Sequence, residues 1–351
     1  MIRPGSGRLR IGVIGLGRLW EARHKPALAR MADRFRVTAV YDQVARRAEL
    51  EAAQLGAAAL TGLSELIDRP DVDAVYLLAP QWFGLHAIDL AAAAGKPIYC
   101  ALPLASDPDE IDRLDARIRA SGVAFMPEFA RRFYPASLRL RELIATRIGA
   151  PRLVVSKSRL SAFDRSSQPG PSTQIAPNSL LIDPGSYLLA WCRFVFQSEP
   201  VSVQGWGGVI FPGDPGQGNA IGPDPDYETF LLEFAGGAAA QVSVGKYHRG
   251  PWGDAAKFLP PPGIQVYAER GVAWLEMPDR IHWTDESGTH QERLPMEPSV
   301  GEVLNDHFLR LVRGEPSLAP GWDDALAVAR LIGALRQSRH DGRRIEAARP
   351  R

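Results

Sequence analysis

Short apolar runs alternate with amphipathic stretches through the first third of the chain. The apolar runs predicted to be strands lie at residues 9–14, 36–41, 73–78, 97–100 and 123–126. Helix-like stretches follow them, at residues 15–32, 45–55, 84–94 and from 107 onward. Strands that alternate with helices predict a parallel sheet with right-handed crossovers and helices on both faces.

The pattern changes after Gly149-Ala150-Pro151. Strand-like runs divided by glycine- and proline-rich loops lie at residues 152–158, 201–209, 228–234, 238–245, 264–268 and 272–276. They predict a mostly antiparallel sheet in the second half of the chain. The tail returns to helix: Ser299 and Glu302 have the spacing of a capping box, and Asp323 opens a last helix.

Composition and charge narrow the classes of protein. The 41 Lys and Arg residues balance 40 Asp and Glu residues, so the net charge of +1 lacks the basic excess of a nucleic-acid-binding surface. No apolar run approaches the ~20 residues that span a bilayer, and no apolar signal segment opens the chain. We expect a cytoplasmic protein that binds neither nucleic acid nor membranes. Cys100 and Cys192 lack metal-like spacing, so we expect reduced core thiols and no metal site.

A glycine-rich turn lies between the first predicted strand and the first predicted helix. It reads Gly15-Leu16-Gly17-Arg18-Leu19-Trp20. The first glycine permits a tight turn, the second lets the backbone approach a pyrophosphate, and the helix N-terminus supplies amide donors. This context predicts dinucleotide binding, although Trp20 replaces the third glycine of the full pattern. The Trp20 side chain either lines the cofactor mouth or packs in the core.

Asp42 ends the second predicted strand, 25 residues after Gly17. An acid at this place binds the adenine ribose hydroxyls of NAD, and the alternative is an ordinary helix N-cap. Arg46 and Arg47 follow closely and would favour the 2′-phosphate of NADP. We expect NAD as the cofactor, with NADP as the alternative.

Further segments, in a fixed order, carry a family resemblance. Besides the glycine turn they are Pro26-Ala27-Leu28, Ala79-Pro80-Gln81-Trp82 with His86, Cys100-Ala101-Leu102-Pro103-Leu104, Arg131-Arg132-Phe133-Tyr134-Pro135 and Asp183-Pro184-Gly185-Ser186-Tyr187. In this order they resemble the glucose–fructose oxidoreductase, inositol dehydrogenase and MocA (Gfo/Idh/MocA) oxidoreductase family. The resemblance spans residues 9–190, and the last predicted helix fits it.

The resemblance implies a Rossmann domain at residues 1–126 and an α/β domain for substrate binding and oligomerisation at 127–318. A C-terminal helix at 319–351 would pack back on the first domain. The implied reaction is hydride transfer between bound nicotinamide and a hydroxyl-bearing carbon of a sugar or cyclitol, in a homo-oligomer joined through the second sheet. The residues expected around the cofactor are Gly15, Gly17, Arg18, Leu19, Trp20, Asp42, Ala79, Pro80, Trp82, His86, Ala101, Leu102 and Pro103.

The sequence departs from the family at its usual catalytic cation. Ala101-Leu102-Pro103 matches the family's Glu-Lys-Pro segment, so leucine replaces the lysine that polarises the reacting oxygen. Tyr187, at the family's histidine position, is then the candidate acid/base, and Asp183 one helical turn earlier would orient Tyr187 or the substrate. The alternatives are a core tyrosine with a satisfied hydroxyl and a helix-capping aspartate.

Competing functional hypotheses follow from this departure. The first is an NAD(P)-dependent oxidoreductase with an altered proton relay through Tyr187. The second is a non-catalytic sensor or regulator that binds the cofactor on the same fold, suggested by Ala101, Leu102 and Ala190. A third keeps the cofactor bound and uses transient oxidation to assist elimination or glycoside cleavage. We favour the first, and steady-state hydride transfer distinguishes it from the second.

Overall fold

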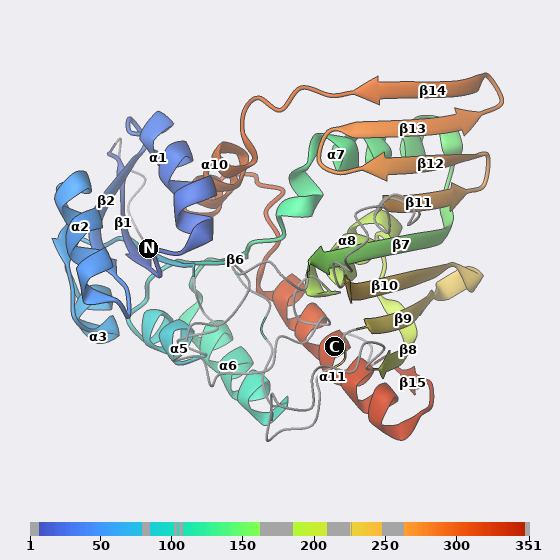
Figure 1. Ribbon diagram of the computed structural model, residues 1–351. Helices are drawn as coiled ribbons and strands as arrows, with labels where there is room; N and C mark the ends of the chain where they lie inside the picture. Colours follow the sequence, from blue (N-terminus) through green and yellow to red (C-terminus); the bar gives the residue numbers. More distant parts are fainter. Residues whose placement is uncertain are drawn as a thin grey trace. The chain divides into compact units, whose positions relative to one another are not determined.

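The computed structural model describes residues 7–78, 85–101, 104, 108–161, 185–208, 225, 227–247 and 263–347. The chain divides into two compact units, each made of two chain segments. The first unit combines Met1–Phe133 with Met296–Ala329, and the second combines Tyr134–Pro295 with Arg330–Arg351. Each unit is built on its own sheet (Figure 1).

The sheet of the first unit is parallel and doubly wound, in the order β3-β2-β1-β4-β5-β6. Its strands are β1 (Leu9–Ile14), β2 (Phe35–Tyr41), β3 (Ala58–Ala59), β4 (Ala74–Leu77), β5 (Ile98–Cys100) and β6 (Phe125–Pro127). The direction of winding reverses between β1 and β4, which pair directly. The carboxyl ends of these strands therefore form the switch point at which open α/β sheets bind ligands.

Helices cover both faces of this sheet. The helices of the first unit include α2 (Ala45–Leu55), α3 (Leu63–Ile67), α5 (His86–Ala93), α6 (Pro108–Ser121), α10 (Val300–Arg313) and the start of α11 (Trp322–Asp341). Val75 and Ile98 share one apolar core with α3, α5, α6 and α11. Tyr76 and Tyr99 alternate with them along the strands and face the opposite side, where both meet Phe308 of α10.

The helix after the glycine turn is less regular than the sequence predicts. It is helical from residue 18 to residue 30, but Trp20–His24 forms a π turn before the regular α1 (Lys25–Arg30). Pro26 explains the difference, because proline has no N–H to donate to the preceding turn. The π turn buries both Trp20 and His24.

The capping box predicted at the start of α10 is confirmed. Ser299 Oγ accepts from the Glu302 N–H (3.4 Å), and Glu302 Oε2 accepts from the Ser299 N–H (3.0 Å). Hydrogen bonds from Arg30 and Ser299 hold the pKa of Glu302 at about 2. Because Arg30 belongs to α1, the carboxylate that caps α10 also ties α10 to α1.

The sheet of the second unit has the order β14-β13-β12-β11-β7-β10-β9-β8-β15. The strands are β7 (Pro151–Ser161), β8 (Pro200–Gly208), β9 (Tyr227–Phe234), β10 (Ala239–Tyr247), β11 (Gly263–Ala268), β12 (Gly271–Glu276), β13 (Arg280–Asp285), β14 (Gly288–Arg293) and β15 (Ile345–Glu346). Among the described strands of this sheet, only β7 and β10 pair in parallel. The predicted fold class, a Rossmann domain followed by an α/β domain on a mostly antiparallel open sheet, is confirmed.

Helices cover one face of the second sheet. Those of this unit are α7 (Pro135–Leu143), α8 (Ser186–Phe196) and the end of α11, with short turns at Ile144–Ile148 and Ala235–Gly237 joining elements along the chain. A further short turn, Ala130–Phe133, ends the first chain segment of the first unit. The α11 end is anchored where the Gly205 N–H donates to Ser338 Oγ (3.0 Å). Val154 and Val266 on the covered face are fully buried, whereas Leu153 and Tyr267 on the open face are 36% and 40% exposed.

Two features of the second half differ from the sequence expectations. The hairpin of β13 and β14 is not predicted, because every residue of β14 other than glycine is polar and the strand shows no apolar alternation. Residues 127–133 and 296–318, expected in the second domain, belong to the first unit. The later of these segments contains α10, which packs against α1. The predicted C-terminal segment is divided as well, since Arg330 onward belongs to the second unit.

No helix in the described ranges has the length and apolarity needed to cross a membrane.

Gly301 marks a close approach between α10 and α1. A Cβ added there would lie 2.6 Å from the Arg23 carbonyl oxygen and 2.9 Å from the Ala27 Cβ. We expect Gly301→Ala to destabilise the protein by about 1–3 kcal/mol through overpacking. The matched control is Gly333→Ala in α11, where an added Cβ meets no atom within 4 Å and a gain of about 0.5–1 kcal/mol is expected. Thermal unfolding followed by circular dichroism measures both, and an equal Tm for the two variants would contradict the close packing.

Candidate functional site

The glycine turn joins the carboxyl end of β1 to the first helix. Gly15 has a φ of 91°, a conformation that favours glycine, and its N–H donates to the Tyr41 carbonyl at the end of β2 (2.8 Å). Gly17 is exposed, and a Cβ placed there would meet no atom within 4 Å. The protein therefore leaves the Gly17 backbone open to close approach by a ligand, as a dinucleotide-binding turn requires.

Asp42 is nearly buried at the end of β2 and holds the glycine turn. Its Oδ2 accepts from the Leu16 N–H (2.8 Å), and its Oδ1 accepts from the Val44 N–H (2.9 Å). Arg47 Nη1 lies 3.2 Å and 3.3 Å from the two carboxylate oxygens. The N-cap of α2 is Val44, so the interpretation of Asp42 as an ordinary N-cap is wrong.

Three more of the predicted cofactor residues begin the first helix. Arg18 is exposed, Leu19 is half-buried and Trp20 is fully buried. The indole Nε1 of Trp20 has no hydrogen-bond partner among the described residues. Of the two alternatives for the Trp20 side chain, the structure shows packing within the first unit.

Two other predicted residues lie directly after β5 and at the start of α5. Ala101 follows β5, is fully buried, and its N–H donates to the Leu77 carbonyl (2.9 Å). His86 is the first residue of α5 and is exposed. The predicted residues that lie outside the described ranges are Ala79, Pro80, Trp82, Leu102, Pro103 and Asp183. The structure thus gathers Gly15, Asp42 and Ala101 at the carboxyl edge of one sheet.

Tyr187 is the second residue of α8, in the second unit. It is half-buried, whereas its neighbours Ser186 and Leu188 are fully buried. Partial exposure at the first turn of a helix is compatible with contact to a ligand. In the described part of the chain, no group of three His, Cys, Asp or Glu side chains is arranged to hold a metal ion.

A buried polar cluster that was not predicted from the sequence lies beside the helix that follows the glycine turn. Glu128 follows β6 and is 1% exposed. Arg23 and His24, from the π turn, both contact its carboxylate, with His24 Nε2 at 2.9 Å from Oε2. His24 is fully buried, and the Arg23 side chain is mostly so. One buried carboxylate thus holds two consecutive residues of the first helix.

The other side of His24 faces α10. Its Nδ1 lies 3.3 Å from Asn305 Oδ1, which also accepts from Tyr76 Oη (3.2 Å). Tyr76 and Tyr99 stack with ring centroids 4.7 Å apart, and His24 packs edge-on against both rings. The cluster therefore joins β4, β5, β6, the π turn and α10.

Burial and charge act in opposite directions on the titration of this cluster. Burial raises the pKa of Tyr76 and Tyr99 well above the usual phenol range, so both stay neutral. Burial also acts to raise the pKa of Glu128, but the charges and hydrogen bonds of His24 and Arg23 outweigh it and lower that pKa. The only sequence signal for the cluster is a glutamate set in an apolar stretch, Phe125-Met126-Pro127-Glu128-Phe129-Ala130.

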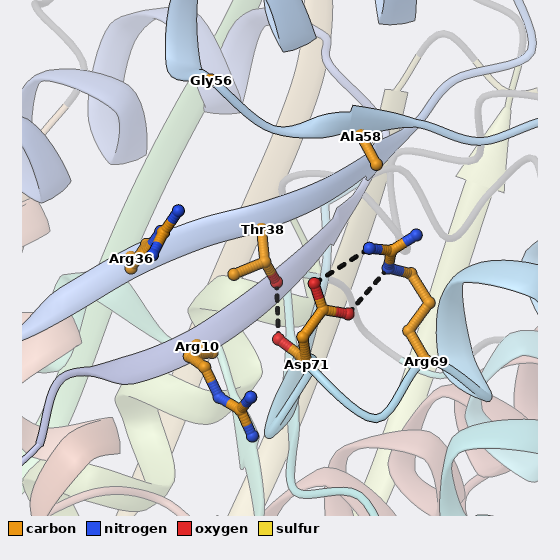
Figure 2. A pocket seen from close by; sticks show the side chains of 7 residues that line it. All are labelled: Arg10, Arg36, Thr38, Gly56, Ala58, Arg69 and Asp71. Carbon is orange, nitrogen blue, oxygen red and sulfur yellow. Dashed lines mark hydrogen bonds and ion pairs between the residues drawn. The ribbon is translucent and has the colours of Figure 1, made fainter.

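A pocket of about 270 Å³ lies at the opposite edge of the first sheet (Figure 2). It is lined by Arg10, Arg36, Thr38, Gly56, Ala58, Arg69 and Asp71. Arg69 pairs with Asp71 (2.8 Å), and Arg10 pairs with Asp73 (2.6 Å). Each of these two arginines is paired with a carboxylate. The pocket lies at the amino ends of the strands, whereas the glycine turn follows the carboxyl end of β1, so the pocket is not part of the glycine-turn site.

The fold and the glycine turn define a class, the Rossmann dinucleotide-binding proteins with an appended α/β domain. Residues 9–129 match the model of an oxidoreductase family with an NAD-binding Rossmann fold, and residues 137–274 match the GFO/IDH/MocA C-terminal domain. The chain therefore belongs to the GFO/IDH/MocA family of oxidoreductases. The predicted family, enzyme class and NAD cofactor are confirmed.

Relatives match two thirds or more of the chain. An inositol 2-dehydrogenase of Rhizobium meliloti (strain 1021) is 25% identical over 350 residues, which cover 97% of this chain and 99% of the relative. An inositol 2-dehydrogenase of Cereibacter sphaeroides is 31% identical over 242 residues, covering 67% of this chain and 66% of the relative. A levoglucosan dehydrogenase, solved in complex with NADH and levoglucosan, matches with a TM-score of 0.82 at 19% identity over 97% of this chain and 100% of that structure, which shows a shared fold.

Asp42 provides a direct test of the site at the glycine turn. We expect Asp42→Ala to weaken NADH binding roughly ten- to hundredfold, the ~1.5–3 kcal/mol of charged hydrogen bonds. NADPH should lose less affinity, because the change frees Arg47 to meet a 2′-phosphate. Fluorescence titration with both nucleotides measures the two dissociation constants. Arg46→Ala is the control, since exposed Arg46 pairs only with Glu49 among the described residues; an unchanged NADH affinity in Asp42→Ala would contradict the site.

Proposed function

We propose that this protein is an NAD-dependent dehydrogenase that transfers hydride between nicotinamide and a hydroxyl-bearing carbon of a sugar or cyclitol. The observation that carries the proposal is the end-to-end similarity to an inositol 2-dehydrogenase, over 97% of this chain and 99% of that relative. The inositol 2-dehydrogenase of Cereibacter sphaeroides supports the same substrate class. NADP is the alternative cofactor, because Arg47 lies beside Asp42.

In this proposal the glycine turn and its neighbours hold the cofactor. The open backbone at Gly17 and the amides of the first helical turn, from Arg18 and Leu19, receive the pyrophosphate. Asp42 keeps the turn closed and accepts from the adenine ribose hydroxyls. The other residues proposed to complete the cofactor site are Ala79, Pro80, Trp82, His86, Ala101, Leu102 and Pro103, and Trp20 supports the turn by packing.

Tyr187 is proposed as the acid/base. When bound, nicotinamide supplies the hydride acceptor, and a protein group must then take the proton of the substrate hydroxyl. Leu102 stands where the family has a lysine, and leucine neither donates a hydrogen bond nor carries charge. Tyr187 stands at the family's histidine position, and Asp183 would orient it or the substrate.

A second candidate function is a non-catalytic sensor that binds the cofactor. It is favoured by Leu102, because loss of the cation that polarises the reacting oxygen removes a main source of rate in this fold. Under this alternative, NADH binds at the glycine turn and no substrate is oxidised. The two candidates share the cofactor site and differ only in turnover.

The test is Tyr187→Phe in a turnover assay. Wild-type protein is incubated with NAD or NADP and a panel of inositols, aldoses and anhydrosugars, and reduction is followed at the nicotinamide absorbance. We expect turnover by wild type and a loss of roughly 10²–10⁴-fold in kcat for Tyr187→Phe, the usual contribution of a general acid or base. NADH affinity should be unchanged, because the phenol acts on the substrate.

Tyr134→Phe is the matched control and should keep wild-type turnover. Tyr134 is the half-buried N-cap residue of α7, and no side-chain hydrogen bond caps the helix there. Full activity of Tyr187→Phe would remove Tyr187 as the acid/base. Tight NADH binding without turnover across the panel would instead favour the sensor.

We further propose that a second copy of this chain covers the open face of the second sheet. Leu153 of β7 pairs in register with Tyr267 of β11, which pairs in register with Val272 of β12. These three apolar side chains form a row that is 36–40% exposed, and a contiguous exposed apolar row favours association. On the same face, the buried indole N–H of Trp274 has no acceptor among the described residues.

Replacement of this row tests the assembly. We expect wild type to be an oligomer by analytical ultracentrifugation. The double variant Tyr267→Arg, Val272→Arg should raise the dissociation constant of the oligomer at least tenfold. Leu318→Arg is the control, because Leu318 is 76% exposed and lies in the first unit. A monomeric wild type, or an unchanged oligomer in the double variant, would overturn the proposal.

A further inference from the structure

Glu128 connects separate segments of the first unit. It follows β6, contacts Arg23 and His24 in the π turn, and reaches Asn305 of α10 through the His24 ring. The carboxylate and the imidazole both have side-chain exposures of 0%. The contacts link the end of one strand directly to the helix that begins at the glycine turn.

The helix transmits this attachment to the turn. The Glu21 N–H donates to the Gly17 carbonyl (3.1 Å), and the chain is helical from residue 18 through residue 30. Arg23 and His24 therefore lie one to two helical turns from Gly17 along a continuous hydrogen-bonded segment. A shift of the π turn at these residues would move the amides that begin the helix.

The charges make the attachment specific. A buried carboxylate is costly unless it is paired and hydrogen-bonded, and breaking such a pair by removing one partner is strongly destabilising. Here a guanidinium and an imidazole, from consecutive residues, share one carboxylate. Neutral glutamine at position 128 would remove the buried negative charge that both side chains contact, so the attachment of the π turn to the end of β6 would weaken and the π turn would move.

We propose that Glu128 is a positioning residue for cofactor binding: through Arg23 and His24 it fixes the helix whose first amides meet the dinucleotide. This inference rests on the proposed placement of the cofactor on the glycine turn. It adds a residue some 110 positions further along the chain from Gly17, at which no cofactor contact is proposed. The carboxylate acts on affinity through the geometry of the turn.

The test compares Glu128→Gln with Glu228→Gln. Glu228 is also a buried carboxylate paired with an arginine, Arg339 at 2.5 Å, but it belongs to the second unit. NADH dissociation constants are measured well below the Tm of each full-length variant, and hydrogen exchange is measured without nucleotide for peptides that cover residues 16–24. Both variants should have a lower Tm than the wild type. Only Glu128→Gln should raise the dissociation constant, about tenfold, and speed exchange at residues 16–24.

Further variants keep the test decisive. Glu128→Asp, which retains the charge, should recover most of the NADH affinity. Should Glu128→Gln fail to fold, Arg23→Gln replaces it, because Arg23 is 26% exposed and its loss leaves Glu128 paired with His24. Arg23→Gln should raise the dissociation constant severalfold. An unchanged dissociation constant in the folded variant, or an equal rise in Glu228→Gln, would overturn the proposal.

Failure of the inference is distinguishable from failure of the proposed site. If Asp42→Ala weakens NADH binding while Glu128→Gln leaves it unchanged, the glycine turn holds the cofactor and Glu128 has only a structural role. If Asp42→Ala leaves binding unchanged, the cofactor site lies elsewhere and both proposals fall. Faster exchange at residues 16–24 in Glu128→Gln, with nucleotide affinity reduced, supports both.

Discussion

A turn that offers its backbone amides to a ligand cannot use all of them to hold itself together. This constraint applies to residues 15–18 in their proposed role as the turn that binds the cofactor. The Gly15 N–H bonds to the end of β2, and the Leu16 N–H bonds to the Asp42 carboxylate, so the chain is fixed before it reaches Gly17. At Gly17 an added Cβ would meet no atom within 4 Å, and from there the restraint passes to side chains. Polar side chains at neighbouring strand ends therefore hold the turn in place, as backbone hydrogen bonds do in other turns.

The two faces of the first sheet serve this constraint differently. One face is a continuous apolar core shared with α3, α5, α6 and α11, which stabilises the sheet without directing any polar group. The other face carries tyrosines at the matching positions of β4 and β5, with His24, Glu128 and Asn305 close by. Hydrogen bonds are directional and apolar contacts are not. The polar face can therefore define the position of the first helix more sharply than the apolar face can.

Most of the fold and part of the site could be predicted from the sequence, because their signals are local. A few adjacent residues are enough to predict the strand at residues 9–14, the helix at 45–55 and the capping box of Ser299 and Glu302. The structure contains each of these elements. The π turn was hidden because its cause, Pro26, follows it along the chain. Glu128 was hidden for a different reason: its partners lie about a hundred residues upstream, and only the folded sheet brings them together. The polar edge strand β14 shows the same limit, since pairing with β13 and not its own composition makes it a strand.

The first unit is assembled from both ends of the chain, and this sets an order of events during synthesis. Residues 7–133 can form the parallel sheet, but α10 and the start of α11 emerge only after the second sheet has been made. At a translation rate of about 5–20 residues per second, the 175 residues from 133 to 308 take roughly 9–35 s. During that interval the tyrosine-bearing face lacks Phe308 and Asn305, its partners from α10. The nascent chain therefore presents an uncovered aromatic surface to the ribosome exit and to chaperones until α10 has been made.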